Sequence, residues 1–127
     1  MKPILVKRAS KEINFEWDKG STFRYKFLWT SGKDEINQSP VSLSGAEARA
    51  DFRDEQGNLL HRLSTDSGTI DLDNDGIEGQ IQMYISAADL ASFTWEFSRY
   101  DMDIFFQNGD TRKLIHGTFR LFEESTV

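Results

Sequence analysis

Apolar and charged side chains alternate without a break in Ala46-Glu47-Ala48-Arg49-Ala50-Asp51-Phe52-Arg53, and this alternation is the strongest indication of the fold class. A β-strand sends successive side chains to opposite faces, so this stretch as a strand has one apolar and one fully charged face. Ala, Glu and Arg also favour helix, but a helix would spread the four charges around its circumference. Residues 46–53 therefore predict a half-buried strand in preference to a helix.

The same period of two recurs along the chain. Phe23, Tyr25, Phe27 and Trp29 form an aromatic row on one face of a predicted strand. Further alternating or apolar stretches predict strands at 4–7, 13–17, 59–64, 69–72, 80–85, 95–106 and 114–122. Turn residues separate them every 8 to 12 residues or so, which is typical of a β-sandwich or a small barrel.

One short segment favours helix. In Ser86-Ala87-Ala88-Asp89-Leu90, the Ser86 hydroxyl can cap the first turn, and Asp89 lies three residues further on. Eight residues do not hold a helix by themselves. We therefore expect one or two helical turns at 86–93 that bridge two sheets.

Composition limits the class of protein. A chain of 127 residues fits a single domain, 1–127. The formal net charge of −6 argues against sequence-independent binding of nucleic acid and against binding to anionic membranes. The absence of Cys excludes disulfides and thiolate chemistry. The apolar run after Pro3 is too short for a signal peptide, which predicts synthesis in the cytoplasm.

No stretch of the sequence matches a known catalytic motif. His61 and His116 each lie in a predicted strand without a partner at motif spacing, and we interpret them as ordinary strand residues. Asp101 and Asp103 share one strand face, as a carboxylate pair of a glycosidase could, but a solvated face explains them more simply. We therefore predict no enzyme, no catalytic residue and no cofactor. A small hydrolase remains a further hypothesis, and it requires a cleft with converging carboxylates.

The acidic run Asp71-Leu72-Asp73-Asn74-Asp75-Gly76 resembles the start of a calcium loop, in which oxygen ligands occupy positions 1, 3 and 5. Position 12 is Gln82 instead of a bidentate Glu, and predicted strands flank the run. A turn rich in Asx residues is the preferred interpretation. Calcium at Asp71, Asp73 and Asp75 is kept as the alternative, and otherwise we predict no metal.

Some apolar residues fall on the polar side of their strands, where they predict contact surfaces. These out-of-phase residues are Leu28, Tyr84 and Phe105. We also expect contacts from the N-terminal strand residues Ile4, Leu5 and Val6, from the predicted loop at 30–40 and from the C-terminal tail.

Several segments together resemble a small β-sandwich that recurs in tailed bacteriophages. The segments that carry the resemblance are Phe15-Glu16-Trp17-Asp18-Lys19-Gly20 with the aromatic strand 23–29; Leu43-Ser44-Gly45-Ala46 through Arg53 with Gly57-Asn58-Leu59-Leu60; 68–72 and 76–85 with Ser86-Ala87-Ala88-Asp89-Leu90; and Tyr100-Asp101-Met102-Asp103-Ile104 with Asn108-Gly109-Asp110 and Leu114-Ile115-His116-Gly117. They occur in order over most of the chain, from about Phe15 to Leu121.

The resemblance implies an all-β, immunoglobulin-like antiparallel β-sandwich of about seven to nine strands with one short helix. It also implies a non-enzymatic structural or adaptor subunit of the virion, in the tail or baseplate, whose partners are other tail or baseplate proteins in multiple symmetric copies. The alternative is a carbohydrate- or receptor-binding module, which requires exposed coplanar aromatic rings, for example at Trp29 or Trp95.

Overall fold

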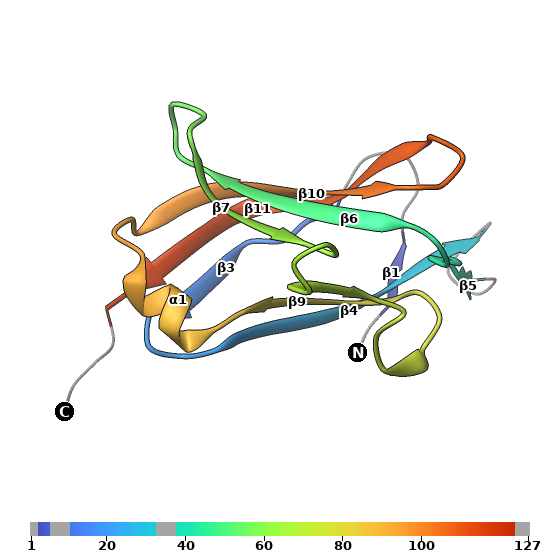
Figure 1. Ribbon diagram of the computed structural model, residues 1–127, viewed down its shortest axis with the longest axis horizontal. Coiled ribbons are helices and arrows are strands. Elements are labelled where there is room, and N and C mark those ends of the chain that lie inside the picture. Colours follow the sequence, from blue (N-terminus) through green and yellow to red (C-terminus); the bar gives the residue numbers. More distant parts are fainter. Residues whose placement is uncertain (1–2, 6–10, 33–37, 124–127) are drawn as a thin grey trace.

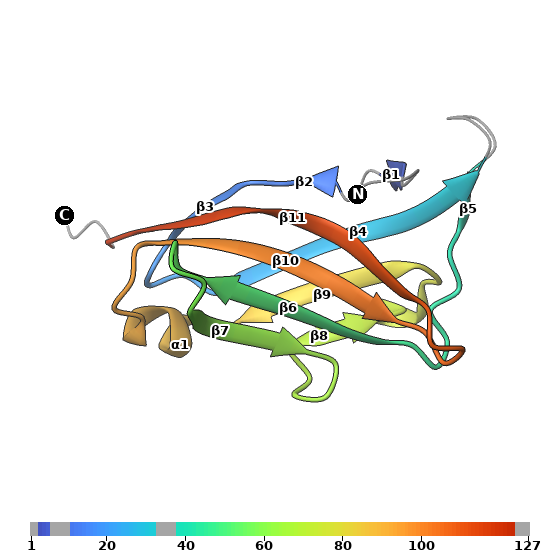
Figure 2. The ribbon, with the colours of Figure 1, turned by 90° about the horizontal axis from the view of Figure 1, so that it is seen from above.

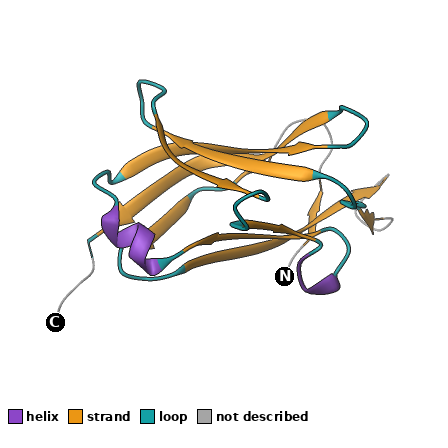
Figure 3. Ribbon diagram, in the orientation of Figure 1, coloured by secondary structure: helices purple, strands orange, loops and turns teal. Residues whose placement is uncertain are grey.

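The computed structural model describes residues 3–5, 11–32 and 38–123 and consists of two β-sheets packed face to face (Figure 1). Strands account for most of the described ribbon, and helix is confined to two short pieces (Figure 3). The predicted all-β sandwich is therefore confirmed.

The sheets differ in size, and each is named here after its longest strand. The β4 sheet has five strands: β1 (Pro3–Leu5), β4 (Phe23–Gly32), β9 (Gln80–Ile85) and β8 (Ile70–Leu72) in that order, with β5 (Gln38–Pro40) also paired to β4. The β11 sheet has six: β2 (Lys11–Glu12), β11 (Thr111–Phe122), β10 (Phe97–Phe105), β6 (Glu47–Arg53) and β7 (Leu59–Ser64) in that order, with β3 (Phe15–Asp18) also paired to β11.

Strand β6 lies within the alternating segment 46–53, which is therefore a strand, as predicted. Its apolar face is buried, with Ala48, Ala50 and Phe52 all at most 3% exposed. It pairs antiparallel with β7 on one side and with β10 on the other. The central place in a sheet, together with burial of one face, outweighs the helix propensity of its Ala, Glu and Arg residues.

The core is an aromatic contact zone between the sheets. The ring of Phe119 on β11 is fully buried and packs against the rings of Phe15, Phe23, Phe52 and Trp95, with centroid distances of 5.1–6.3 Å. Three members of the predicted aromatic row, Phe23, Phe27 and Trp29, are buried, whereas Tyr25 is partly buried.

The predicted helix is present and joins the two sheets. Helix α1 (Ala87–Ser92) lies at one end of the sandwich, between β9 of one sheet and β10 of the other (Figure 1). The Ser86 hydroxyl accepts a hydrogen bond from the backbone N–H of Asp89 at 3.1 Å, which is the predicted cap. Leu90 anchors the helix in the core.

Three details of the fold differ from the sequence prediction. The described residues form eleven strands instead of seven to nine, because the short strands β2 and β5 add to the nine predicted stretches. Strands β1, β2 and β3 run parallel to their neighbours β4 and β11, although an antiparallel sandwich was expected. The polar segment 30–40 is partly strand, because Thr30 to Gly32 extend β4 and pair with β5.

Strands β2 and β3 lie very close to β11, which passes over the β4 sheet in the view of Figure 2. At the crossing, the Ile13 N–H donates to the His116 carbonyl at 2.8 Å, and the Asn14 side-chain oxygen accepts from the Thr118 N–H at 2.9 Å. Gly117 stands opposite, where a Cβ atom would lie 2.1 Å from the Ile13 carbonyl oxygen. Only glycine permits this approach.

Candidate protein-binding face

Charged side chains cover the outer surface of the β11 sheet. Strands β6, β7, β10 and β11 carry six cationic side chains and four carboxylates there, in contrast to the acidic balance of the whole chain, 15 basic against 21 acidic. We call this surface the arginine face; its charged members are Arg49, Arg53, Arg62, Arg99, Lys113, Arg120, Glu47, Asp51, Asp101 and Asp103. Within these four strands the excess of cations favours an acidic partner. Toward the edge of the sheet formed by β2 and β3, Glu12, Glu16 and Asp18 add carboxylates to the same outer surface.

Asp51 is the centre of the arginine face. It is only 8% exposed, although it lies on the charged side of β6. The Arg62 side chain of β7 donates to both carboxylate oxygens, at 2.6 and 3.1 Å, and Arg53 donates at 3.2 Å. Arg49 completes the cluster at 3.8 Å. Because one carboxylate fixes three guanidinium groups, the arginines lose less conformational freedom when they contact a partner.

The same cluster shifts the ionisation of Asp51. Burial alone would raise the pKa of this carboxyl, but the hydrogen bond and charge of Arg62, with the charges of Arg49 and Arg53, hold the pKa below its usual value. Asp51 therefore stays ionised into the acid range, and the cluster persists there.

We expect the Asp51 cluster to contribute to acid sensitivity. The pKa of Asp51 is lower in the folded than in the unfolded protein, so its stabilisation is complete above the unfolded value, near 3.8, and is lost as the pH falls through the folded value. Asp51→Asn should lower the free energy of unfolding by about 1–3 kcal/mol at pH 7. The gap to the wild type should narrow when urea unfolding is repeated at pH 3.

The control is Asp101→Asn. The Asp101 carboxylate is 40% exposed and pairs with Lys113 at 2.7 Å, so its loss should change stability by under about 1 kcal/mol. A gap between Asp51→Asn and the wild type that stays constant from pH 7 to pH 3 would contradict the lowered pKa of Asp51.

Aromatic rings lie among the charges of the arginine face. The Arg49 guanidinium lies over the Phe105 ring at 5.1 Å, and the Arg120 guanidinium lies over Phe97 at 5.3 Å. Phe105, which the sequence predicted as a contact residue, also lines a shallow hollow of about 480 Å³ with Arg62, Ser64 and Asp66. An aromatic ring beside arginines at a hollow is the composition that binding hot spots favour.

The other predicted contact residues are placed elsewhere. Leu28 and Tyr84 lie on the outer surface of the β4 sheet, and both are partly buried. The Arg24 guanidinium covers the Tyr84 ring at 4.9 Å. Ile4 and Leu5 belong to β1 and pair with Trp29 and Thr30.

Some predicted contact elements lie outside the described residues. They are Val6, residues 33–37 of the predicted loop, and residues 124–127 of the C-terminal tail.

A second hollow on the arginine face brings together Asp101 and His116, which the sequence analysis did not connect. Asp101 and His116 are directly opposite each other on β10 and β11, and Glu12 lines the same hollow of about 430 Å³. The Asp101 carboxylate accepts from Lys113. Asp101 and Asp103 share the outer face of β10 as predicted, and Asp103 lies opposite Lys113. Of the two carboxylates, Asp101 lines this shallow hollow.

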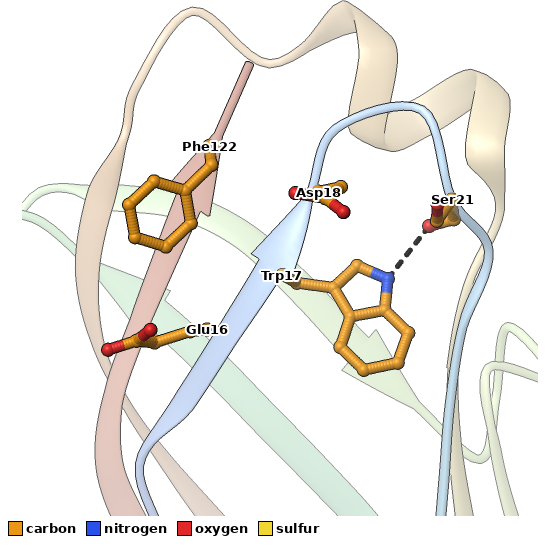
Figure 4. Close-up of a pocket in the computed structure, with 5 residues that line it drawn as sticks. All are labelled: Glu16, Trp17, Asp18, Ser21 and Phe122. Carbon is orange, nitrogen blue, oxygen red and sulfur yellow. Dashed lines mark hydrogen bonds between the residues drawn. The ribbon is translucent and has the colours of Figure 1, made fainter. Parts of the chain in front are cut away.

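A hollow of about 380 Å³ lies between the ends of β3 and β11, at the end of the sandwich that carries α1 (Figure 4). Its lining residues include Glu16, Trp17 and Phe122. The Trp17 indole N–H donates to the Ser21 carbonyl at 2.9 Å, which fixes the ring in place. Phe122 is 44% exposed and is the apolar wall of this hollow.

The three carboxylates of the candidate calcium loop are directed to three different protein groups. Asp71 accepts from the Asn74 side chain at 2.7 Å, Asp73 accepts from the Gly79 N–H at 3.0 Å, and Asp75 pairs with Lys26 at 2.9 Å. Residues 73–77 form a turn that includes the short 3-10 segment η1 (Asn74–Gly76). Within the described residues, no group of three His, Cys, Asp or Glu side chains is arranged to hold a metal.

The two tryptophans named for carbohydrate binding are not arranged as an exposed platform. Trp29 is 3% exposed and belongs to the core. Trp95 is partly buried and stacks on Phe93 with 4.8 Å between centroids, so the rings cover each other instead of lying side by side. The His61 ring packs against the Phe93 ring of this stack, with 4.9 Å between centroids. Burial lowers the pKa of His61.

Sequence reasoning missed the Asp51 cluster. It placed Asp51 on the charged face correctly, but the alternation of β6 carries no signal that Arg62 of β7 stands directly opposite. That pairing depends on the register between the strands, in which Asp51 faces Arg62 on one side and Asp101 on the other.

Comparisons with known proteins add little about function. No family model matches the chain, and no curated protein matches it in sequence. Among solved structures, the chain is similar to extracellular domains 3-5 of Drosophila OTK, at 13% identity and a TM-score of 0.40. The match covers 92% of this chain and 34% of that one, so the chain spans about a third of its length. Among the described residues, no helix is long and apolar enough to cross a membrane.

Proposed function

We propose that the chain is a non-enzymatic structural or adaptor subunit of a tailed-bacteriophage particle, in the tail or baseplate, that acts through protein–protein contacts. The ordered motifs that resemble phage β-sandwich modules support the assignment to a virion. The arginine face supports the mode of action.

The observation that carries the proposed mode is the Asp51 cluster at the centre of the arginine face. Arg is enriched in protein interfaces, because its guanidinium group both stacks on rings and binds carboxylates in a bidentate way. Here three arginines are held by one buried carboxylate, while each keeps more than two-fifths of its side chain exposed. Their free N–H groups can therefore bind acidic side chains of a neighbouring subunit.

Phe105 is the proposed anchor of this contact. The ring lies at the rim of the hollow beside Arg49, so a partner side chain that enters the hollow would contact the ring and the guanidinium together. Each contact of this kind is weak by itself, but many symmetric copies in one particle act together.

The experiment compares two aromatic residues with matched surroundings. Phe105 and Tyr84 are both partly buried, and an arginine covers each ring, but they lie on opposite sheets. Tagged Phe105→Ala and Tyr84→Ala variants are expressed during growth of the phage that encodes the chain, and purified particles are quantified by mass spectrometry. We expect Phe105→Ala to enter particles at least tenfold less than wild type, which corresponds to about 1.4 kcal/mol or more, and Tyr84→Ala to enter within about twofold of wild type.

Two outcomes would contradict the proposal in different ways. Purified particles that lack the chain altogether would overturn the virion assignment. Equal entry of both variants, with melting temperatures close to each other, would leave a virion protein whose contacts do not use the arginine face.

A further inference from the structure

Among the described residues, strand β4 has one edge that is only partly occupied. Its ten residues pair with β9 over 23–28 and with β5 over 30–32. On the opposite edge, β1 pairs with Leu28, Trp29 and Thr30 alone. Among residues 3–5, 11–32 and 38–123, no strand pairs with the first half of β4, 23–27, on that edge.

The direction of the backbone groups in this half follows from Trp29. Its N–H donates to the Gly79 carbonyl at 2.9 Å, and its carbonyl accepts from the Val41 N–H at 3.0 Å, so both point to the side of β9 and β5. Backbone groups alternate between the two edges of a strand. Those of Arg24 and Lys26 therefore point to the other edge, where they form a template for an added strand.

The side chains at this edge restrict what can pair there. Those of Arg24 and Lys26 lie on the outer surface of the β4 sheet, and Lys26 keeps 38% of its side chain exposed although it pairs with Asp75. Two β4 strands paired with each other would place these cations opposite their counterparts, which is unfavourable. A second copy of β4 is thus a poor occupant, whereas carboxylates at alternate positions of the added strand would be favoured.

The opposite face of an added strand would meet aromatic side chains. Tyr25 faces the interior beside this edge, is partly buried, and packs edge-on against Phe15 with 4.8 Å between centroids. An apolar residue between two acidic ones would extend this contact. The edge therefore fits a segment in which acidic and apolar residues alternate.

We propose that the edge of β4 at residues 23–27, with which no described strand pairs on that side, binds, by strand addition, an extended segment of a partner protein with acidic residues at every second position and apolar residues between them. Strand β1 shows that the same edge accepts a strand a few residues further on. This site is separate from the arginine face, and the inference rests on the proposed function only in its use of protein contacts.

The test uses the isolated chain and a synthetic peptide with blocked ends in which Glu and Val alternate over seven residues. Binding is followed by NMR titration of the backbone amides. We expect saturable shifts and slower hydrogen exchange at the Arg24 and Lys26 amides, and little change in exchange at Tyr25 and Phe27, whose amides already face β9. A peptide with Lys in place of Glu should bind at least tenfold more weakly.

The decisive comparison is Lys26→Pro with Lys26→Ala. Both variants remove the lysine side chain, but only proline also removes the N–H of residue 26, which points to the outer edge. The hydrogen bonds between β4 and β9 do not use this N–H, so both variants keep them. We expect Lys26→Pro to bind the peptide at least tenfold more weakly than Lys26→Ala.

A probe variant covers the case in which Lys26→Pro does not fold. Two further peptides of the same sequence carry N-methyl groups on alternate residues, one peptide on the odd and the other on the even positions. Because alternate N–H groups point to opposite edges of a strand, only one of the two peptides should lose binding to the wild-type chain. Equal binding by the two Lys26 variants, equal binding of both methylated peptides, absence of binding, or shifts confined to Phe97 and Phe105 on the arginine face would each overturn the edge proposal. The last of these results would leave the proposed function intact.

Discussion

Gly117→Ala is expected to lower the free energy of unfolding by about 2–4 kcal/mol, because it displaces β2, β3 and the residues between them from β11. The added Cβ would lie 2.1 Å from the Ile13 carbonyl oxygen and 2.8 Å from Asn14 Oδ1. That same carbonyl accepts a 2.6 Å hydrogen bond from the buried Tyr100 hydroxyl. A shift of residues 13 and 14 therefore breaks several hydrogen bonds together.

Gly68→Ala is the control for this prediction. Gly68 has a φ of +80°, but nothing lies within 4 Å of an added Cβ. Its replacement should cost only the backbone strain, about 1–2 kcal/mol. Urea unfolding gives both free energies, and hydrogen exchange should show loss of protection at the Ile13 and Thr118 amides in Gly117→Ala alone. A cost for Gly117→Ala no greater than for Gly68→Ala would refute the close approach.

Phe119→Ala is expected to cost about 3–5 kcal/mol, because it leaves a cavity where the two sheets meet. The ring is fully buried and touches Phe23 of the β4 sheet as well as Phe15 and Phe52 of its own sheet. Rings held from both sides cannot close the space without a shift of one sheet against the other.

Phe119→Leu separates the cavity from the loss of aromatic contacts. It keeps most of the volume, so it should cost roughly 1–2 kcal/mol, which includes the edge-on contacts with Phe23 and Phe52. Urea unfolding measures both variants. A cost below about 1.5 kcal/mol for Phe119→Ala would mean that the sheets close over the missing ring and that Phe119 is not central to the core.

Much of the fold was predictable, because burial of one face of a strand imposes a period of two on the sequence. Strands β4, β6, β9 and β10 all show that period, and the cap at Ser86 identified α1. The turn at Asn108-Gly109 between β10 and β11 also has a local signal, because Gly109 has a φ of +95°. These signals are local, so they survive without knowledge of the neighbouring strands.

Features that depend on register were not predictable. The alternation of residues 80–85 places Gln80 on the polar side of its strand, but Gln80 is only 8% exposed, and its amide donates to the backbone and side-chain oxygens of Asn74. Leu114 and Ile115 are adjacent yet both buried, because a β-bulge shifts the register opposite Met102 and Asp103. Alternation in one strand cannot indicate either arrangement.

The candidate site was predictable in part. Phe105 stood out as an apolar residue on a charged side, and the structure places it at a hollow on the arginine face. The burial of Asp51 depends on Arg62, eleven residues away and on another strand. Residue types alone do not predict that contact, because β6 and β7 could also pair in a different register.

The parallel pairing of β3 with β11 has a consequence for synthesis of the protein. Asn14 and Thr118 are 104 positions apart in sequence. Strands β2 and β3 therefore remain without their partner β11 until β11 has left the ribosome. Sandwiches with such distant pairings fold in milliseconds to seconds. The aromatic side chains of residues 15–29 are therefore exposed to solvent until the later strands are synthesised. Binding by a chaperone during translation would keep the nascent chain from aggregating.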